Sequence, residues 1–210
     1  MGAIIFDFDG TMVDSFDFVV DFLATEANMP KLTHQQKLKL RGQSMSAIGR
    51  SFGHSWPKLL WLFYKGRRQM TDHLQKLQLF DGIAELIVKL HKQNYQLYIV
   101  SSNTRRNINM FLRHRELKNS FRDIYGGVGL FGKAPALRRL LRKNNLLKSS
   151  TVYIGDELRD VEASHSIGLP VIAVSWGFSR TESLKELKPT SLVSTVAELG
   201  HAIDQLKLIQ

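Results

Sequence analysis

The 210-residue sequence predicts an α/β protein in which a doubly wound parallel sheet carries a small helical domain inserted after its first strand. Two observations support this prediction. Short apolar runs rich in β-branched and aromatic residues alternate with segments of helical spacing, which is typical of strands and crossover helices in a parallel sheet. The first two runs are separated by roughly ninety residues with no convincing strand, which is far too long for one crossover.

Five apolar runs are expected to be strands, because each is too short for a helix and is bounded by polar or glycine residues. They are residues 3–6, 97–100, 124–128, 152–154 and 171–174. Between them lie segments with helical spacing, marked by Ile83, Leu86, Ile87 and Leu90 and by Leu137, Leu140 and Leu141. A last helix is expected over about 195–206. The sheet domain should therefore comprise residues 1–15 and 80–210.

The inserted segment, residues 16–79, is expected to form a separate helical domain. Its first helix is broken by Pro30. A capping box at Thr33 and Gln36 predicts a second, short helix. A third helix is expected to begin at Ser44.

A long helix should complete the insertion. Ser55 reads as its N-cap, and Pro57 lies in its first turn. Three aromatic residues of this helix are expected in the core of the inserted domain: Trp56, Trp61 and Phe63.

The positive charge of the chain is concentrated in the insertion. The formal net charge is +10, and the segment 31–70 contains nine basic residues and no Asp or Glu. The basic residues are Lys31, Lys37, Lys39, Arg41, Arg50, Lys58, Lys65, Arg67 and Arg68. Such a field favours anionic partners, which include small phosphates, nucleic acid and acidic lipid, although a solvated basic face is the simpler interpretation.

Composition also excludes several classes of protein. The chain has no cysteine, so disulfide frameworks and thiolate metal sites are excluded. No run approaches the ~20 apolar residues that a membrane span requires. The amino terminus becomes acidic at Asp7 before an apolar signal region develops. We therefore expect a cytoplasmic protein without a membrane partner, either a monomer or a homodimer.

Polar residues follow the predicted strands at the points where the strands end. In open parallel sheets the ligand lies at the carboxyl ends of the strands, so these residues are expected to converge. They are Asp7, Asp9, Gly10 and Thr11 after the first run, Ser101, Ser102 and Asn103 after the second, Lys133 before a later helix, and Asp156, Glu157 and Asp160 after the fourth.

Paired carboxylates at this edge need a counter-charge. Two of them ~4 Å apart repel by about 4 kcal/mol at an effective dielectric constant of 20. A hard cation removes this repulsion, and a set of oxygen ligands without cysteine or clustered histidine indicates Mg²⁺. The sequence therefore predicts a magnesium ion, and then a substrate phosphate, between the aspartates and Lys133.

Four motifs in order carry a resemblance to a known family. FDFDGT, IVSSN, the lysine of GKAP and YIGDELRD resemble the signature motifs of the haloacid dehalogenase (HAD) superfamily of aspartate-nucleophile phosphatases. The helical insertion directly after the first motif resembles the C1 cap of subfamily I, which contains phosphoglycolate phosphatase and β-phosphoglucomutase. The resemblance covers the core from Ile4 to about Phe178 and implies a Rossmann-like core with a helical cap.

The resemblance implies roles for the acidic residues. Asp7 would be the nucleophile that forms an aspartyl-phosphate. Asp9 would protonate the leaving alcohol and then deprotonate the attacking water, while its backbone carbonyl binds the metal. Asp156 would be the third protein ligand of Mg²⁺, and Asp160 would support the site by orienting a bound water or Lys133.

The resemblance also implies a phosphate-binding set. Ser101 and Lys133 would hold the phosphoryl oxygens, helped by the backbone near Gly10 and Thr11 and near Ser102. Glu157 departs from the threonine or serine of many relatives, and its side chain is expected to point away from the site.

The expected function is a Mg²⁺-dependent phosphatase for a small phosphate monoester, with phosphoglycolate as the leading substrate. Two alternatives stay open at this point. A phosphomutase or phosphotransferase of the same superfamily would use the same four motifs and pass the phosphoryl group to a sugar hydroxyl. A non-catalytic protein would bind anions or nucleic acid through the basic segment, but this segment has no recognised nucleic-acid motif, so a nucleic-acid partner is not expected.

Overall fold

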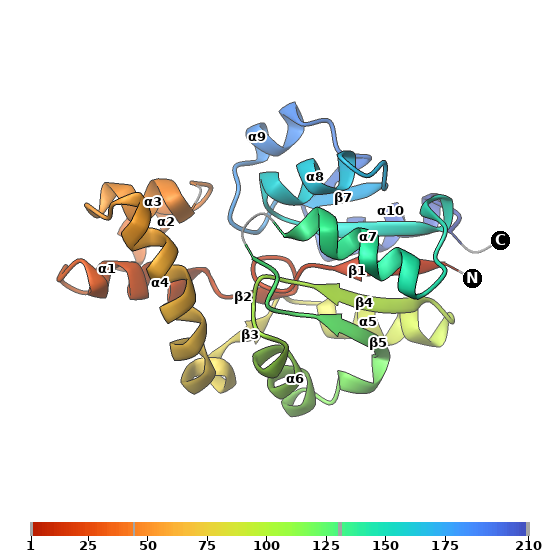
Figure 1. Cartoon of the computed structure of the whole chain (residues 1–210), viewed down its shortest axis with the longest axis horizontal. Coiled ribbons are helices and arrows are strands. Elements are labelled where there is room, and N and C mark those ends of the chain that lie inside the picture. Colours follow the sequence, from red (N-terminus) through yellow and green to blue (C-terminus); the bar gives the residue numbers. More distant parts are fainter. Residues whose placement is uncertain (1, 44, 130–131, 209–210) are drawn as a thin grey trace.

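In the computed structural model, which describes residues 2–43, 45–129 and 132–208, six parallel strands form one sheet at the centre of the protein (Figure 1). They are β1 (Ala3–Phe6), β4 (Gln96–Val100), β5 (Phe121–Tyr125), β6 (Thr151–Gly155), β7 (Val171–Val174) and β8 (Ser191–Val193). Their order is β5-β4-β1-β6-β7-β8, and every neighbouring pair is parallel. The predicted doubly wound sheet is confirmed, with β8 as a strand that was not predicted.

Helices cover both faces of this sheet. On one face lie α5 (Ile83–Lys92), α6 (Arg105–His114) and α10 (Val196–Gln205), and on the other lie α7 (Lys133–Lys143), α8 (Leu158–His165) and α9 (Thr181–Glu186). Side chains alternate along β1, so Ile4 and Phe6 join the first core and Ala3 and Ile5 the second. Short 3₁₀ turns, η2 (Lys118–Ser120) and η3 (Lys148–Ser150), precede β5 and β6. In the described parts of the chain, no helix is long and apolar enough to cross a membrane.

Four helices between β1 and the rest of the sheet lie together beside it (Figure 1). They are α1 (Phe16–Glu26), α2 (His34–Leu40), α3 (Met45–Ser51) and α4 (Trp56–Gln69). They share a core of their own that includes Val20, Ile48 and Leu62. Both hydrogen bonds of the predicted capping box at the start of α2 are present. Ser44, where a helix was expected to begin, lies outside the described residues.

The chain leaves and re-enters the sheet domain through two paired segments. β2 (Val13–Asp14) and β3 (Gln78–Leu79) are antiparallel neighbours. A 3₁₀ helix, η1 (Met70–Lys76), joins α4 to β3, and its Met70 and Leu74 are buried in the core of the sheet domain. We propose α1 to α4 as the helical cap, with η1 as its return segment; these contacts of η1 favour a boundary near the end of α4.

The prediction that Trp56 and Trp61 are core residues is wrong. Trp56 is 56% exposed and Trp61 is 51% exposed. Helix α4 turns Leu62 toward the cap core instead. The Nζ atoms of Lys58 and Lys65 each lie 4.8 Å from the centroid of the Trp61 ring, so cation–π contacts take the place of burial. The side chain of Phe63 lies outside the described part of the structure.

This orientation of α4 predicts opposite outcomes for neighbouring residues. Leu62→Ala should lower the free energy of unfolding by about 2 to 5 kcal/mol, because it opens a cavity in the cap core. Trp61→Ala removes a larger side chain but should lower the free energy of unfolding by about 1 kcal/mol or less, because Trp61 is largely exposed. Urea unfolding followed by circular dichroism measures both. A larger loss for Trp61→Ala than for Leu62→Ala would contradict the orientation.

Candidate active site

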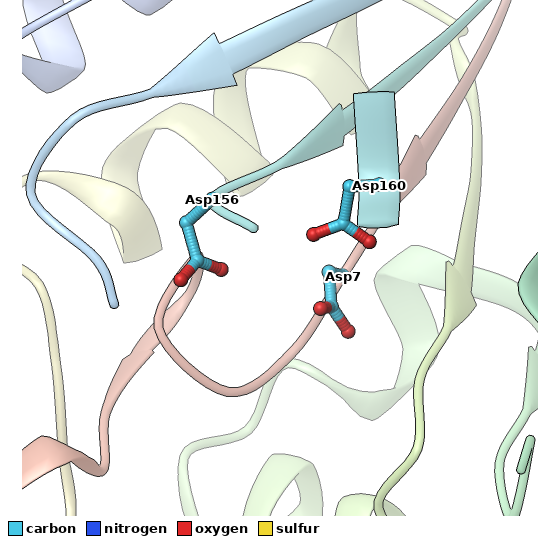
Figure 2. A group of neighbouring side chains, drawn as sticks. All are labelled: Asp7, Asp156 and Asp160. Atoms are coloured by element: carbon cyan, nitrogen blue, oxygen red, sulfur yellow. The ribbon is translucent and has the colours of Figure 1, made fainter. Parts of the chain in front are cut away.

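Three buried aspartates meet at the carboxyl edge of the sheet. Asp7 follows β1, Asp156 follows β6, and Asp160 lies in the first turn of α8. Figure 2 shows their carboxyl groups gathered above the loop that follows β1. Each residue is at most 2% exposed, and one carboxylate oxygen from each lies within 4.8 Å of the others. Asp7 and Asp156 are far apart along the chain, so the sequence alone did not predict how close their carboxylate oxygens lie.

Lys133 is in direct contact with two carboxylates of this cluster. It begins α7, is 2% exposed, and places its Nζ 2.5 Å from Oδ2 of Asp7 and in contact with Oδ1 of Asp160. Burial lowers the pKa of Lys133, but Asp160 and Asp7 outweigh that effect and raise it above its ordinary value. The ammonium group therefore stays charged and holds the two carboxylates.

Asp160 is fixed on its remaining sides as well. The hydroxyl of Tyr153, on β6, donates to Oδ1 of Asp160 at 2.9 Å, and the backbone N–H of Glu157 donates to Oδ2 at 3.0 Å. Asp160 therefore accepts hydrogen bonds from Tyr153, from the N–H of Glu157 and from Lys133. That it orients Lys133 stays a prediction.

Asp156 is enclosed by two loops. Thr11 Oγ1 donates to Oδ1 of Asp156 at 2.6 Å, and the backbone N–H of Phe178 donates to Oδ2 at 2.8 Å. A Cβ on Gly10 or Gly177 would lie 2.3 or 2.2 Å from Oδ2 of Asp156, so neither position can hold a side chain without a shift. The FDFDGT loop therefore needs Gly10 for close approach to Asp156.

Asp7 and Asp9 point to different environments. Oδ1 of Asp7 accepts from the backbone N–H of Phe8 at 2.7 Å, and its Oδ2 faces Lys133. Oδ2 of Asp9 accepts from Nδ2 of Asn103 at 2.9 Å. Oδ1 of Asp9 is buried and accepts no hydrogen bond of normal geometry from the described residues. Burial raises the pKa of Asp9, and the hydroxyl of Ser15 and the amide of Asn103 oppose this shift, so Ser15 also faces this carboxyl group.

The electrostatics of the cluster indicate a missing positive charge. Burial raises the pKa of Asp7 to about 7, although Lys133 opposes this shift. Burial, Glu157 and the neighbouring aspartates raise the pKa of Asp156 well above its usual range. Lys133 alone does not balance the buried carboxylates. Their oxygen-only donor set fits a hard divalent cation such as Mg²⁺.

The ligand set that the geometry offers differs in one member from the expected one. Asp7, Asp9 and Asp156 were expected to bind the metal, and the carboxylate group that the structure brings together consists of Asp7, Asp156 and Asp160. Asp9 was expected to contribute its backbone carbonyl, which a grouping of carboxylate oxygens does not include. Since Asp160 already accepts hydrogen bonds from Lys133, Tyr153 and the N–H of Glu157, the original set stays our prediction.

The phosphate-binding residues expected from the sequence lie at this edge, but they differ in whether their polar groups already have hydrogen-bond partners. Ser101 is fully buried, and its Oγ accepts from the backbone N–H of Asn103 at 3.1 Å, which leaves its O–H for a ligand. Ser102 is also buried. The hydroxyl of Thr11 is used by Asp156, and the N–H of Gly10 donates to the carbonyl of Val13 at 2.8 Å. Their part in the described structure is to shape the loop.

Glu157 does not simply point away. It forms an ion pair of 2.7 Å with Nη2 of Arg159 and raises the pKa of Asp156. Nε and Nη1 of Arg159 are buried without a hydrogen-bond partner in the part of the chain that the structure describes. Arg159 also lowers the pKa of Asp7, so it contributes positive charge to the cluster.

Several residues of the site were not identified from the sequence. Tyr153 reads as a core residue of a strand. Asn103 was placed at this edge by the sequence, but its contact with Asp9 was not predicted. Arg159 sits inside the YIGDELRD motif, where its charge next to two acids was a usable signal. Phe178 contributes only its backbone N–H to the site, so the identity of its side chain did not indicate this contact.

Comparison with known proteins assigns the family. Residues 4–174 match the haloacid dehalogenase-like hydrolase family. Over 209 residues the chain is 37% identical to the phosphoglycolate phosphatase of Synechococcus elongatus, which covers 98% of this chain and 99% of that protein. The chain therefore belongs to the haloacid dehalogenase-like hydrolase family, and the prediction from the four motifs is confirmed.

Other relatives agree with this assignment. A 5'-nucleotidase of Pseudomonas aeruginosa is 27% identical over 213 residues, which cover 96% of this chain and 95% of that protein. Among solved structures, a predicted phosphatase from Clostridium acetobutylicum matches with a TM-score of 0.79 at 21% identity, covering 97% of this chain and 98% of that chain. The last match bears on the fold alone. The chain is an enzyme, and its relatives support a phosphoric monoester hydrolase.

The raised pKa of Asp7 predicts a pH-dependent stability difference. Native Asp7 keeps its proton up to about pH 7, whereas the unfolded residue loses it near its ordinary pKa of 3.8. Between these values the unfolded state binds fewer protons, so Asp7 progressively destabilises the native state as pH rises. In metal-free buffer, the free energy of unfolding of Asp7→Asn minus that of wild type should increase between about pH 4 and 7 and then level off.

Urea unfolding at a series of pH values with a chelator measures this difference. Asp204→Asn is the matched control, because Asp204 is an exposed aspartate whose ion pair with Lys89 is 3.6 Å long. The increase for Asp7→Asn should exceed any change for this exposed variant. A pH-independent difference for Asp7→Asn would contradict the raised pKa.

Proposed function

We propose that the protein is a Mg²⁺-dependent phosphatase that hydrolyses a small phosphate monoester, such as phosphoglycolate, through an aspartyl-phosphate on Asp7. The single observation that carries this proposal is the buried group of Asp7, Asp156 and Lys133 at the carboxyl edge of the sheet. Family membership and the named relatives support the same chemistry.

The contacts of Asp7 suit a nucleophile. Lys133 and the N–H of Phe8 fix its carboxylate, so little reorientation is needed before attack. Attack of an Asp7 oxygen forms a bond to phosphorus as the bond from phosphorus to the ester oxygen breaks. Asp9, whose pKa is raised by burial, gives a proton to the departing alkoxide.

The second half of the reaction returns the enzyme to its starting state. Asp9 takes a proton from a water molecule, which attacks phosphorus and breaks the bond to Asp7. Inorganic phosphate leaves, and Asp7 is again a carboxylate. Lys133 and the hydroxyl of Ser101 are placed to bind phosphoryl oxygens in both steps.

A bound Mg²⁺ would neutralise the charge of the phosphoryl oxygens and of the aspartates together. Asp7, Asp156 and the backbone carbonyl of Asp9 would hold it. Thr11 and the N–H of Phe178 orient Asp156 for this purpose.

The positive charge of the cap favours a substrate that has a second anionic group besides its phosphate. Arg67, near the end of α4, interacts electrostatically with Asp9, so positive charge from the cap reaches the catalytic edge. Its Nη2 would lie 3.5 Å from a Cβ on Gly127, in the segment that follows β5. The relative with 37% identity is named for phosphoglycolate, a phosphate ester with a carboxylate.

The nucleophile is tested by Asp7→Asn. With p-nitrophenyl phosphate and Mg²⁺, kcat should fall by about 10³-fold or more, because an amide cannot attack phosphorus. Asp204→Asn should keep wild-type activity, since Asp204 lies on the exposed face of α10. Chelation of Mg²⁺ should abolish wild-type turnover, and excess Mg²⁺ should restore it. Full activity of Asp7→Asn, or turnover that is indifferent to chelation, would refute the proposed function.

The substrate class is tested with a matched pair of esters. Phosphoglycolate and ethyl phosphate have similar leaving groups, but only the first has a carboxylate. We expect a higher kcat/KM for phosphoglycolate than for ethyl phosphate. In Arg67→Met the ratio of the two kcat/KM values should fall by about ten-fold, which corresponds to the loss of one hydrogen bond between charged groups. An unchanged preference in Arg67→Met would show that Arg67 does not bind the second anion.

A further inference from the structure

The side-chain amide of Asn103 has several hydrogen-bond partners, and one of them is the carboxylate of Asp9. Its Nδ2 donates to Oδ2 of Asp9 at 2.9 Å and to Sδ of Met70, in η1, at 2.9 Å. Its Oδ1 accepts from the N–H of Thr104 at 2.8 Å and from Nδ2 of Asn107 at 3.1 Å. The residue is 1% exposed. Both the amide nitrogen and the amide oxygen of Asn103 therefore have partners.

The orientation of this amide follows from its neighbours. If its oxygen and nitrogen were exchanged, Oδ1 would face the carboxylate of Asp9 and Nδ2 would face the N–H of Thr104. Both contacts would be repulsive, so the amide group must present its N–H to Asp9.

Asn107 connects the same amide to the return segment of the cap. Its Nδ2 donates to the backbone carbonyl of Arg67 at 2.8 Å, and its Oδ1 accepts from Oγ1 of Thr71 at 2.8 Å. Arg67 and Thr71 flank the junction at which α4 becomes η1. Asn107 is 1% exposed and lies on α6, which packs against η1. One continuous network therefore runs from the cap junction to Asp9.

We propose that Asn103 is a positioning residue for Asp9, and that Asn107 and Thr71 hold Asn103 so that attachment of the cap junction and orientation of Asp9 form one unit. The proposal rests on the proposed function, in which Asp9 protonates the leaving group. Asn103 holds Oδ2 of Asp9, whereas Oδ1 accepts no hydrogen bond of normal geometry among the described residues and has the hydroxyl of Ser15 as its neighbour. Without Asn103, the carboxyl group can rotate away from the ester oxygen.

The test compares leaving groups that differ in their need for a proton. p-Nitrophenolate departs as a stable anion, whereas the alkoxide of phosphoglycolate must be protonated as it leaves. The ratio kcat/KM includes only the steps up to leaving-group departure, so later hydrolysis of the phosphoenzyme does not affect it. In Asn103→Ala, kcat/KM for phosphoglycolate should fall about ten-fold more than kcat/KM for p-nitrophenyl phosphate.

Thr71→Val tests the connection to the cap junction, since it keeps the shape of the side chain and removes the hydroxyl that holds Asn107. It should shift the ratio of the two kcat/KM values in the same direction by a smaller factor, about two- to five-fold. Asn109→Ala is the control on the same helix, because the amide of Asn109 is exposed and bonds only to the carbonyl of Arg105 among described residues. Its ratio should equal that of wild type.

Equal losses for the two substrates in Asn103→Ala would overturn the positioning role. If this variant does not fold, Asn103→Ser replaces it and the same ratio decides. An unchanged ratio in folded Thr71→Val would overturn the link to the cap junction. Failure of the proposed function is recognised separately, because wild type would then lack Mg²⁺-dependent hydrolysis of both esters.

Discussion

The burial of three carboxylates around one lysine is the constraint on which the structure of the site depends. Asp7, Asp156 and Asp160 are buried together, and Lys133 balances only part of their charge. Such a group is unfavourable unless a further cation joins it. The raised pKa values of Asp7 and Asp156 express this imbalance. The same imbalance makes the edge suitable for a divalent ion and a phosphate.

The order of the strands in the sheet brings these carboxylates together. β1 lies between β4 and β6, so the loops after these three strands reach the same point. Close approach then depends on Gly10 and Gly177, which lie against Asp156. The cap is joined to this edge through β2 and β3 and through η1, whose Met70 touches Asn103. The four helices α1 to α4 are therefore connected through these contacts to the edge of the sheet that holds the aspartates.

Local pattern was sufficient for much of the fold and for the acids of the site. Buried parallel strands read as short apolar runs, and the acids directly after them, such as Asp7 and Asp156, could be placed at one edge by topology. β8 was not found because it is a short edge strand and only partly buried. The tryptophans of α4 were misplaced, since their size suggested burial although Lys58 and Lys65 cover Trp61 outside the core. The contacts of Asn103 and Tyr153 depend on tertiary packing, which sequence spacing does not encode.

The central claim is that a divalent ion completes the charge balance of the aspartate cluster. Titration calorimetry of the metal-free protein with Mg²⁺ near pH 7, in two buffers of different ionisation enthalpy, measures stoichiometry and proton release together. The account predicts one ion per chain, release of protons because the pKa of Asp7 is about 7, and loss of binding in Asp156→Asn. No binding to the wild-type chain, or unchanged binding in Asp156→Asn, would contradict it.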